Sequence, residues 1–241
     1  MQVLGRKCRP RRIFSGLASG YRICVSPAEN LAYVLGTAEP SLQRAIRRYV
    51  FPGDVVYDIG ANIGYVSLSL ARQVGSRGKV IAFEPVPQTF DLLCRNIELN
   101  HTANITPLNA AASDRTGETS IRVTSNLSMA SLVWHRNDFS AAELPVRTVR
   151  VDELVKRGEL ERPSFVKIDV EGAEGMVIAG LENTLARARP VIYLECSERG
   201  RQITWPMLHD LKYRCQSPGN RQWIDNFEEY RHADFLWLPA K

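Results

Sequence analysis

The fold is decided by the stretch Asp58-Ile59-Gly60-Ala61-Asn62-Ile63-Gly64-Tyr65, which joins a short apolar run to an amphipathic segment. Residues 55–59 are mostly apolar, as is typical of a strand that is covered on both faces of its sheet. From Gly64 onward, apolar residues recur at every fourth position as far as Val74, which predicts a helix ending near Gly75. The stretch is therefore expected to be a strand-to-helix turn, in which glycines allow a tight bend and the close approach of a ligand.

The same alternation continues after this turn. Strands are expected at 79–83, 105–111, 165–169, 191–195 and 234–238, and helices at 87–100, 173–187 and 205–213. Residues 119–124 and 146–151 alternate like strands, and the polar stretch 125–142 between them is expected to be a loop. Repeated strand–helix units predict an α/β fold, a doubly wound and mainly parallel sheet with helices on both faces.

The segment before this pattern looks different. Residues 1–50 are expected to be an N-terminal extension and lead-in that caps the domain formed by residues 51–241. They hold nine Lys or Arg against two acidic residues, and 1–20 are expected to be irregular. Arg11-Arg12-Ile13-Phe14 is weakly similar to a twin-arginine export signal, but 16–25 contain no long apolar run. We therefore expect 1–12 to be a flexible, dispensable basic leader.

Composition excludes several classes of protein. The 241 residues are 44% hydrophobic and 24% charged, which suits one soluble domain with a full core. No segment has the roughly 18 apolar residues of a membrane span. Much of the net charge of +5 lies in the leader rather than in the domain, so a nucleic-acid partner is not expected. Five cysteines without a CxxC pair predict free thiols in a reducing, cytoplasmic setting.

Two ligand classes fit the glycine turn. Glu84 ends the next expected strand, 20 residues after Gly64, where a carboxylate can accept the ribose hydroxyls of an adenosine. A dinucleotide site requires G-x-G-x-x-G, but Asn62 and Tyr65 occupy two of those positions. S-adenosylmethionine carries no phosphate, and its ammonium and sulfonium groups suit an acid at Asp58. A methyl donor is therefore favoured, while an NAD-dependent oxidoreductase and a catalytically inactive binding protein with the same fold remain alternatives.

Three motifs resemble one known family. The glycine stretch from Pro52 to Tyr65, Phe83-Glu84-Pro85 and Lys167-Ile168-Asp169-Val170-Glu171-Gly172-Ala173-Glu174 are similar, in this order, to motifs of FkbM-type methyltransferases. The resemblance extends over about residues 33–195. It implies a class I, Rossmann-like fold and O-methylation of a hydroxyl group on a sugar or secondary metabolite.

The expected donor site follows from these motifs. Asp58, Gly60, Asn62 and Gly64 are expected at the methionine end of S-adenosylmethionine, and Glu84 at its ribose. By analogy with the fold, the adenine is expected at two residues after the third strand, Ala111 and Ala112.

The expected catalytic residues lie in the third motif. An alkyl hydroxyl needs help in losing its proton, and Asp169 or Glu171 can act as the base. Alternatively, both residues hold a divalent cation together with Glu195. For Glu174, an equally supported alternative is that it only stabilises the positive N-terminal end of its helix. His135, in the polar stretch, is a further candidate for the acceptor site.

Overall fold

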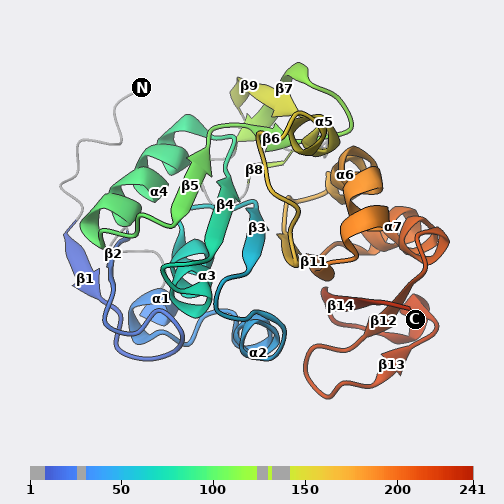
Figure 1. The fold of residues 1–241 in the computed structure, drawn as a ribbon, viewed down its shortest axis with the longest axis horizontal. Coiled ribbons are helices and arrows are strands. Elements are labelled where there is room, and N and C mark those ends of the chain that lie inside the picture. The colour runs from blue at the N-terminus through green and yellow to red at the C-terminus, as the bar shows by residue number, and fades with distance from the viewer. Residues whose placement is uncertain (1–8, 26–30, 124–129, 132–141, 241) are drawn as a thin grey trace.

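An eight-stranded sheet forms the centre of the computed structural model, which describes residues 9–25, 31–123, 130–131 and 142–240 (Figure 1). The strands are β3 (Val55–Ile59), β4 (Lys79–Phe83), β5 (Ile105–Leu108), β10 (Phe165–Ile168), β11 (Val191–Glu195), β12 (Tyr213–Gln216), β13 (Trp223–Ile224) and β14 (Asp234–Pro239). Their order is β13-β12-β14-β11-β10-β3-β4-β5. The five strands from β11 to β5 are parallel, whereas β14 runs antiparallel to both β11 and β12. The expected mainly parallel sheet is confirmed.

Helices cover both faces of this sheet. On one side lie α2 (Pro40–Tyr49), α3 (Tyr65–Val74) and α4 (Pro87–Leu99), and on the other lie α5 (Val151–Lys156), α6 (Glu174–Ala188) and α7 (Glu198–Asp210). Successive strand residues point to opposite faces, so Val56 packs in the core beneath α2 and α3, and Tyr57 in the core beneath α6. The apolar strands read from the sequence are thus buried on both faces.

A second, smaller sheet follows β5 and was not expected as a separate unit. It contains β6 (Ala111–Ala112), β7 (Gly117–Val123), β8 (Ala130–Ser131) and β9 (Ala142–Val149), in the order β6-β9-β7-β8. The strand expected at 105–111 is wrong beyond Leu108. The side-chain amide of Asn109 donates to the carbonyl oxygens of Glu84 and Pro85 at 2.8 and 3.1 Å, and the chain then turns into β6. The strand expected at 146–151 also ends early, because Val151 begins α5.

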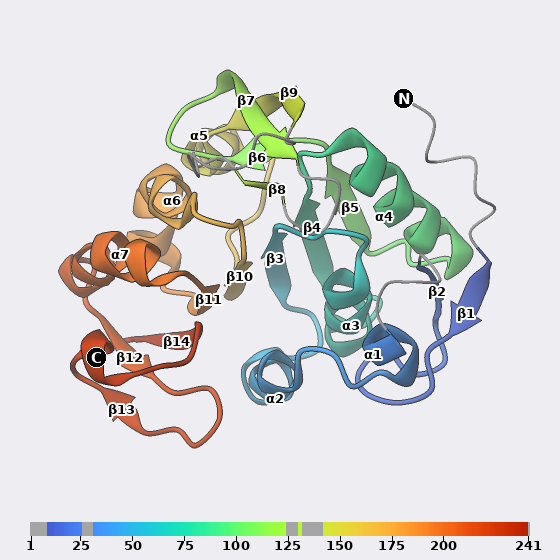
Figure 2. The same cartoon turned by 180° about the vertical axis from the view of Figure 1, so that it is seen from behind.

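The N-terminal segment is more ordered than its composition indicated. The strands β1 (Pro10–Arg12) and β2 (Arg22–Cys24) pair beside α4, as Figure 2 shows, and α1 spans Leu31–Leu35. Ile13 and Ile23 are fully buried in the same core as α2 and α3. The expectation of a flexible start is therefore wrong for residues 10–12, because Ile13 anchors the segment. Residues 1–8 lie outside the described part.

The C-terminal third departs from expectation in the bounds of its helix and in the strands β12 and β13, which were not expected. Helix α7 begins at Glu198, where the Ser197 hydroxyl caps it by accepting from the Gly200 amide at 3.2 Å. It ends at Asp210, so the helix expected at 205–213 is wrong at both ends, and Tyr213 opens β12. A short 3-10 helix, η1, spans Phe227–Glu229. In the described residues, no helix combines the length and apolarity needed to cross a membrane.

Candidate active site

The site lies at the edge of the sheet where the parallel strands end. The order of the strands reverses between β3 and β10, a position at which open α/β sheets bind ligands. Gly60 follows β3 and Asp169 follows β10, so the two loops lie next to each other. Gly60 has a φ of 81°, and a Cβ built on it would lie 1.8 Å from the Asp169 carbonyl oxygen. Glycine is therefore required here both for the bend and for the contact between the loops.

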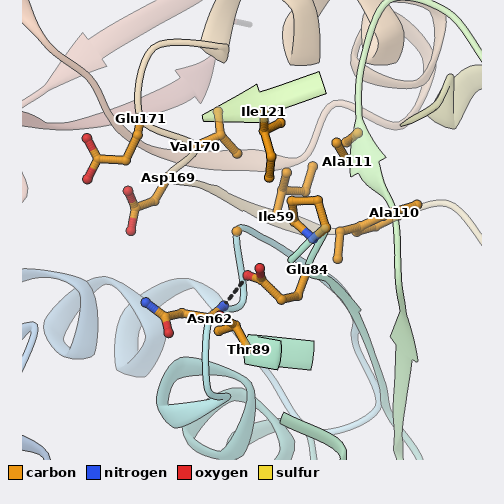
Figure 3. A pocket seen from close by; sticks show the side chains of 14 residues that line it. Ile59, Asn62, Glu84, Thr89, Ala110, Ala111, Ile121, Asp169, Val170 and Glu171 are labelled. Carbon is orange, nitrogen blue, oxygen red and sulfur yellow. Dashed lines mark hydrogen bonds between the residues drawn. The ribbon is translucent and has the colours of Figure 1, made fainter. Parts of the chain in front are cut away.

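A first cavity opens between these loops and the small sheet, and it encloses about 690 Å³, part of it open to solvent. Its polar wall contains Asn62, Glu84, Thr89, Asp169 and Glu171, and its apolar wall contains Ile59, Ala110, Ala111, Ala112 and Ile121 (Figure 3).

Glu84 is held in this cavity by backbone amides. Its carboxylate accepts from the Asn62 amide and from the Val86 amide, both at 2.9 Å. Asn62 has a φ of 50°, a left-handed conformation that asparagine tolerates, and it thereby aims its amide at Glu84. Burial raises the pKa of Glu84 to about 7, against the lowering effect of the two amides. The carboxylate is thus fixed in place and desolvated, with oxygen lone pairs left for a ligand.

A buried ion cluster lies behind the glycine loop. Lys167 and Asp58 are paired in register on β10 and β3, and the Lys167 ammonium lies 3.4 Å from Asp58 and 3.4 Å from Asp169. Lys167 also donates to the Gly60 carbonyl at 2.7 Å, and Ser67 donates to Asp58 at 2.6 Å. Burial acts to lower the pKa of Lys167, but Asp169 and Asp58 outweigh it and raise the pKa. The charged lysine therefore ties β3, the glycine loop and Asp169 together.

A second cavity of about 440 Å³ lies on the α2 side of the same loops. It shares Gly60, Asn62 and Asp169 with the first cavity. Its other polar lining residues come from four separate parts of the chain: Tyr33, Glu39, Tyr65, Lys167, Tyr193 and Glu195.

Carboxylates crowd the second cavity. Glu195 lies directly opposite Asp234 in the antiparallel pair β11–β14. Burial, together with the charges of Asp169, Asp234 and Glu39, raises the pKa of Glu195 to about 8. The pKa of Glu39 is raised too, by burial and by Asp169. Carboxylates brought together in this way against their electrostatic repulsion are typical of functional sites.

The residues expected from the sequence fall into two groups. Gly60, Asn62, Glu84, Ala111, Ala112, Asp169 and Glu171 line the first cavity. Asp58 and Gly64 line neither cavity. Asp58 is fully buried behind the loop, and a Cβ on Gly64 would lie 2.6 Å from the Leu93 side chain, so this glycine lets α3 pack closely on α4. His135 lies outside the described residues, and Glu174 accepts from the Gly172 amide at 2.7 Å.

Sequence reasoning missed several residues of the site. Lys167 belongs to the third motif, but the sequence was not seen to give it a role. A lysine inside an apolar strand is nevertheless itself a signal of a buried charge pair. Tyr33 and Glu39 gave no signal. They are positioned by Gln43, whose side-chain amide donates to the carbonyl oxygens of Gly36 and Ala38 at 3.0 and 2.7 Å.

Known proteins with similar sequences identify the family of this chain. The Methyltransferase FkbM domain model matches residues 58–232. Hexuronic acid methyltransferase AglP of Haloferax volcanii is 34% identical over 139 residues, which cover 58% of this chain and 54% of that protein. The 2-O-methyltransferase NoeI of Sinorhizobium fredii is 29% identical over 196 residues, covering 68% of this chain and 74% of that protein. The chain thus matches only about half the length of AglP.

A solved structure supports the fold. The crystal structure of methyltransferase FkbM from Methylobacillus flagellatus KT superposes with a TM-score of 0.51 at 19% identity, covering 77% of this chain and 43% of that one. At this identity the likeness shows the fold alone. The family model, in contrast, spans most of the chain and begins at Asp58, the first residue of the glycine stretch. This chain therefore belongs to the FkbM family of S-adenosylmethionine-dependent methyltransferases, which have the class I, Rossmann-like fold.

Proposed function

We propose that this chain transfers a methyl group from S-adenosylmethionine to a hydroxyl group of a sugar or secondary metabolite. The observation that carries the proposal is the meeting of two cavities at Gly60, Asn62 and Asp169. One cavity combines an apolar wall with the Glu84 carboxylate, which backbone amides hold in place, and this combination suits a nucleoside. The other is polar and rich in carboxylates. Family membership gives no support to the NAD-dependent oxidoreductase, and turnover would exclude the inactive binding protein.

The first cavity is assigned to the donor. Its residues fit the group, because the Glu84 carboxylate can accept two ribose hydroxyls while Ala111, Ala112 and Ile121 offer an apolar surface to the adenine. Gly60 and Asn62 are assigned to the methionine end. Asp58 and Gly64 are proposed to act indirectly, Asp58 through Lys167 and Gly64 through the packing of α3.

The second cavity is assigned to the acceptor, and Asp169 to the base. The donor supplies a methyl group on a sulfonium, and the acceptor oxygen attacks this carbon in line while S-adenosylhomocysteine leaves. Holding the two reactants in line contributes up to about 7–11 kcal/mol. Asp169 lines both cavities, and its ion pair with Lys167 orients its carboxylate to receive the hydroxyl proton. Glu171, which lines only the first cavity, is proposed to orient the acceptor where it reaches the donor beside Asp169.

We further propose a neutral acceptor for the second cavity. Its lining includes Glu39, Asp169 and Glu195, while its one lysine, Lys167, already pairs with two carboxylates. Hydroxyl groups can form hydrogen bonds with these carboxyl groups in either protonation state. A uronic acid would instead add a further carboxylate to a cluster whose burial and mutual repulsion already raise the pKa values of Glu39 and Glu195. The acceptor would then differ in charge from the one named for AglP, a hexuronic acid.

The cellular compartment of the reaction and its partner molecule are part of the same proposal. Cys94, Cys196 and Cys215 are free thiols, which suits the cytoplasm. A small hydroxyl-bearing molecule is the proposed partner, rather than a nucleic acid. Within the described residues, no group of three or more His, Cys, Asp or Glu is placed to hold a metal ion. Whether a cation assists the reaction is left to a chelator experiment.

The test is a turnover screen with labelled S-adenosylmethionine. The panel contains sugars and natural-product alcohols, with each neutral sugar paired with its uronic acid. We expect methylation of neutral members, and a preference for the uronic acids would contradict the neutral acceptor. Titration calorimetry with S-adenosylhomocysteine and with NAD tests the donor separately, and binding of NAD alone would overturn the proposed function.

A further inference from the structure

The Thr89 hydroxyl is buried without a partner on the wall of the first cavity. Thr89 is only 3% exposed, and its Oγ1 forms no hydrogen bond with any described residue. Hydroxyls on helices often donate back to the preceding turn, as Ser69 does to the Tyr65 carbonyl at 3.0 Å. Thr89, in the first turn of α4, makes no such bond and instead lines the cavity.

An unpaired buried hydroxyl is costly, because it has lost its hydrogen bonds to water. Thr89 is one of the residues that line the cavity, so a ligand bound there lies close enough to supply the missing partner after a rotation of the side chain. Polar groups of this kind, few and fixed, give orientation and specificity to small-molecule sites that are otherwise apolar.

The neighbours of Thr89 indicate which part of a nucleoside it meets. In the view of Figure 3, Thr89 lies with Asn62 and Glu84, while Ala111 and Ile121 lie toward the other side of the cavity. Val86, which donates to the Glu84 carboxylate, caps the helix that carries Thr89. The backbone therefore holds the Glu84 carboxylate and the Thr89 hydroxyl on one polar side, away from the apolar adenine wall.

We propose that Thr89 is a donor-binding residue whose hydroxyl forms a hydrogen bond with a ribose hydroxyl of S-adenosylmethionine. This inference rests on the proposed function, because it assumes that the first cavity holds the donor. Glu84 and Thr89 then share the recognition of the ribose, Glu84 as acceptor and Thr89 as either donor or acceptor. A nucleoside lacking that hydroxyl would leave Thr89 unpaired in the complex.

The first test compares Thr89→Val with Thr89→Ser. Valine keeps the shape and removes the hydroxyl, whereas serine keeps the hydroxyl. By calorimetry, the Kd of S-adenosylhomocysteine should rise about 5–10-fold in Thr89→Val and change less than about 2-fold in Thr89→Ser. The control is Thr106→Val, at an exposed threonine of β5. Melting curves of each variant report whether the fold is retained.

The second test locates the bond. The Kd values of 5′-methylthioadenosine and of its 2′-deoxy and 3′-deoxy analogues are measured for the wild type and Thr89→Val. For one of the two analogues, the wild type should lose more affinity than Thr89→Val does. The variant already lacks the Thr89 hydroxyl, so it can lose only the bond between the ribose and Glu84. Equal losses for both proteins with both analogues would overturn the assignment to the ribose.

The outcomes separate this inference from the proposed function. If Thr89→Val binds S-adenosylhomocysteine as well as the wild type does, Thr89 is not a donor-binding residue, although the donor site stands. If the wild type itself does not bind S-adenosylhomocysteine, the proposed function fails, and the inference fails with it. If Thr89→Ser loses as much affinity as Thr89→Val, the shape of threonine matters rather than its hydroxyl, which also contradicts the inference.

Discussion

The two cavities share one wall but are built in different ways. The first is shaped largely by backbone: amides fix Glu84, and a glycine turn brings Asn62 beside it. The second is shaped by side chains that project from the ends of β10 and β11 and from the lead-in before α2. A site fixed by backbone suits a ligand that is the same in every family member, such as the methyl donor. A site lined by side chains can change its ligand by substitution, as an acceptor site requires.

Gly60 lines both cavities and packs directly against the loop that carries Asp169, so Gly60→Ala should have the largest effect. The new methyl group would lie 1.8 Å from the Asp169 carbonyl, at a φ of 81° that alanine disfavours. We expect a loss of more than about 3 kcal/mol in unfolding free energy, together with loss of donor binding. Urea unfolding and calorimetry measure the two effects.

Gly53→Ala is the matched control. Gly53 has a φ of 95°, but nothing lies within 4 Å of its added Cβ, so only the conformational cost of about 1–2 kcal/mol remains. Equal losses in the two variants would mean that the contact between the loops contributes little.

Asp169→Asn tests whether Asp169, which lines both cavities, is the general base. Turnover of the acceptor identified by the screen should fall about 100-fold or more, because asparagine cannot take the proton. Donor affinity should change far less. Glu171→Gln, at an exposed residue of the same turn, should have the smaller effect if it only orients the acceptor.

Assay of the wild type with a chelator then separates the two roles considered for these carboxylates, general base and cation ligand. Full activity in the presence of the chelator would leave only the role of general base. Turnover that survives both substitutions would move the base elsewhere, with Glu195 or His135 as the next candidates.

Glu84→Ala tests the first cavity alone. Loss of a charged hydrogen-bond partner should weaken donor binding by about 1–3 kcal/mol. Glu98→Ala, on the exposed side of α4, is the control. Donor binding equal to that of the wild type would show that the ribose assignment is wrong.

The same carboxylate predicts a pH dependence. The pKa of Glu84 is raised to about 7 by burial, so the group is protonated below this pH and accepts fewer hydrogen bonds from the ribose. The Kd of S-adenosylhomocysteine should therefore rise as the pH falls from 8 to 6. A Kd that is as pH-dependent in Glu84→Ala as in the wild type would place the titrating group elsewhere.

The smallest effect, a change in stability, is expected at Glu195 in the second cavity. Its pKa is raised from 4.5 to about 8 by burial and by Asp169, Asp234 and Glu39. Between these pH values the folded chain binds more protons than the unfolded chain, so stability falls as the pH rises through this window. Glu195→Gln removes this cost, which solvent screening limits to about 1 kcal/mol.

Melting curves test this sign. The Tm of Glu195→Gln should exceed that of the wild type by roughly 2–4 °C at pH 9 and by almost nothing at pH 5. Glu198→Gln, at an exposed residue, should show no such trend. A Tm difference that grows toward low pH would contradict the raised pKa.

The sequence alone determined the parallel strands of the central sheet and several residues of the first cavity. Gly60, Asn62 and Glu84 lie at the ends of two consecutive strands, and parallel strands necessarily bring such ends to one edge. Strand and helix periodicity is local, so it predicted the parallel strands and most of the helices. The strand expected at 105–111 was wrong because its end is set by Asn109, whose partners lie 24 and 25 residues away in the sequence.

Only the tertiary structure decided which residues line the second cavity. Its lining brings Glu39 of the lead-in together with Lys167 and Glu195, which are separated by long stretches of sequence and share no motif. The same holds for Asp58, whose position in the sequence suggested direct contact with the donor. The register of β3 with β10 places it opposite Lys167 and behind the loop. Sequence spacing predicts which residues reach the edge of a sheet, whereas burial and cross-strand pairing decide which of them face the ligand.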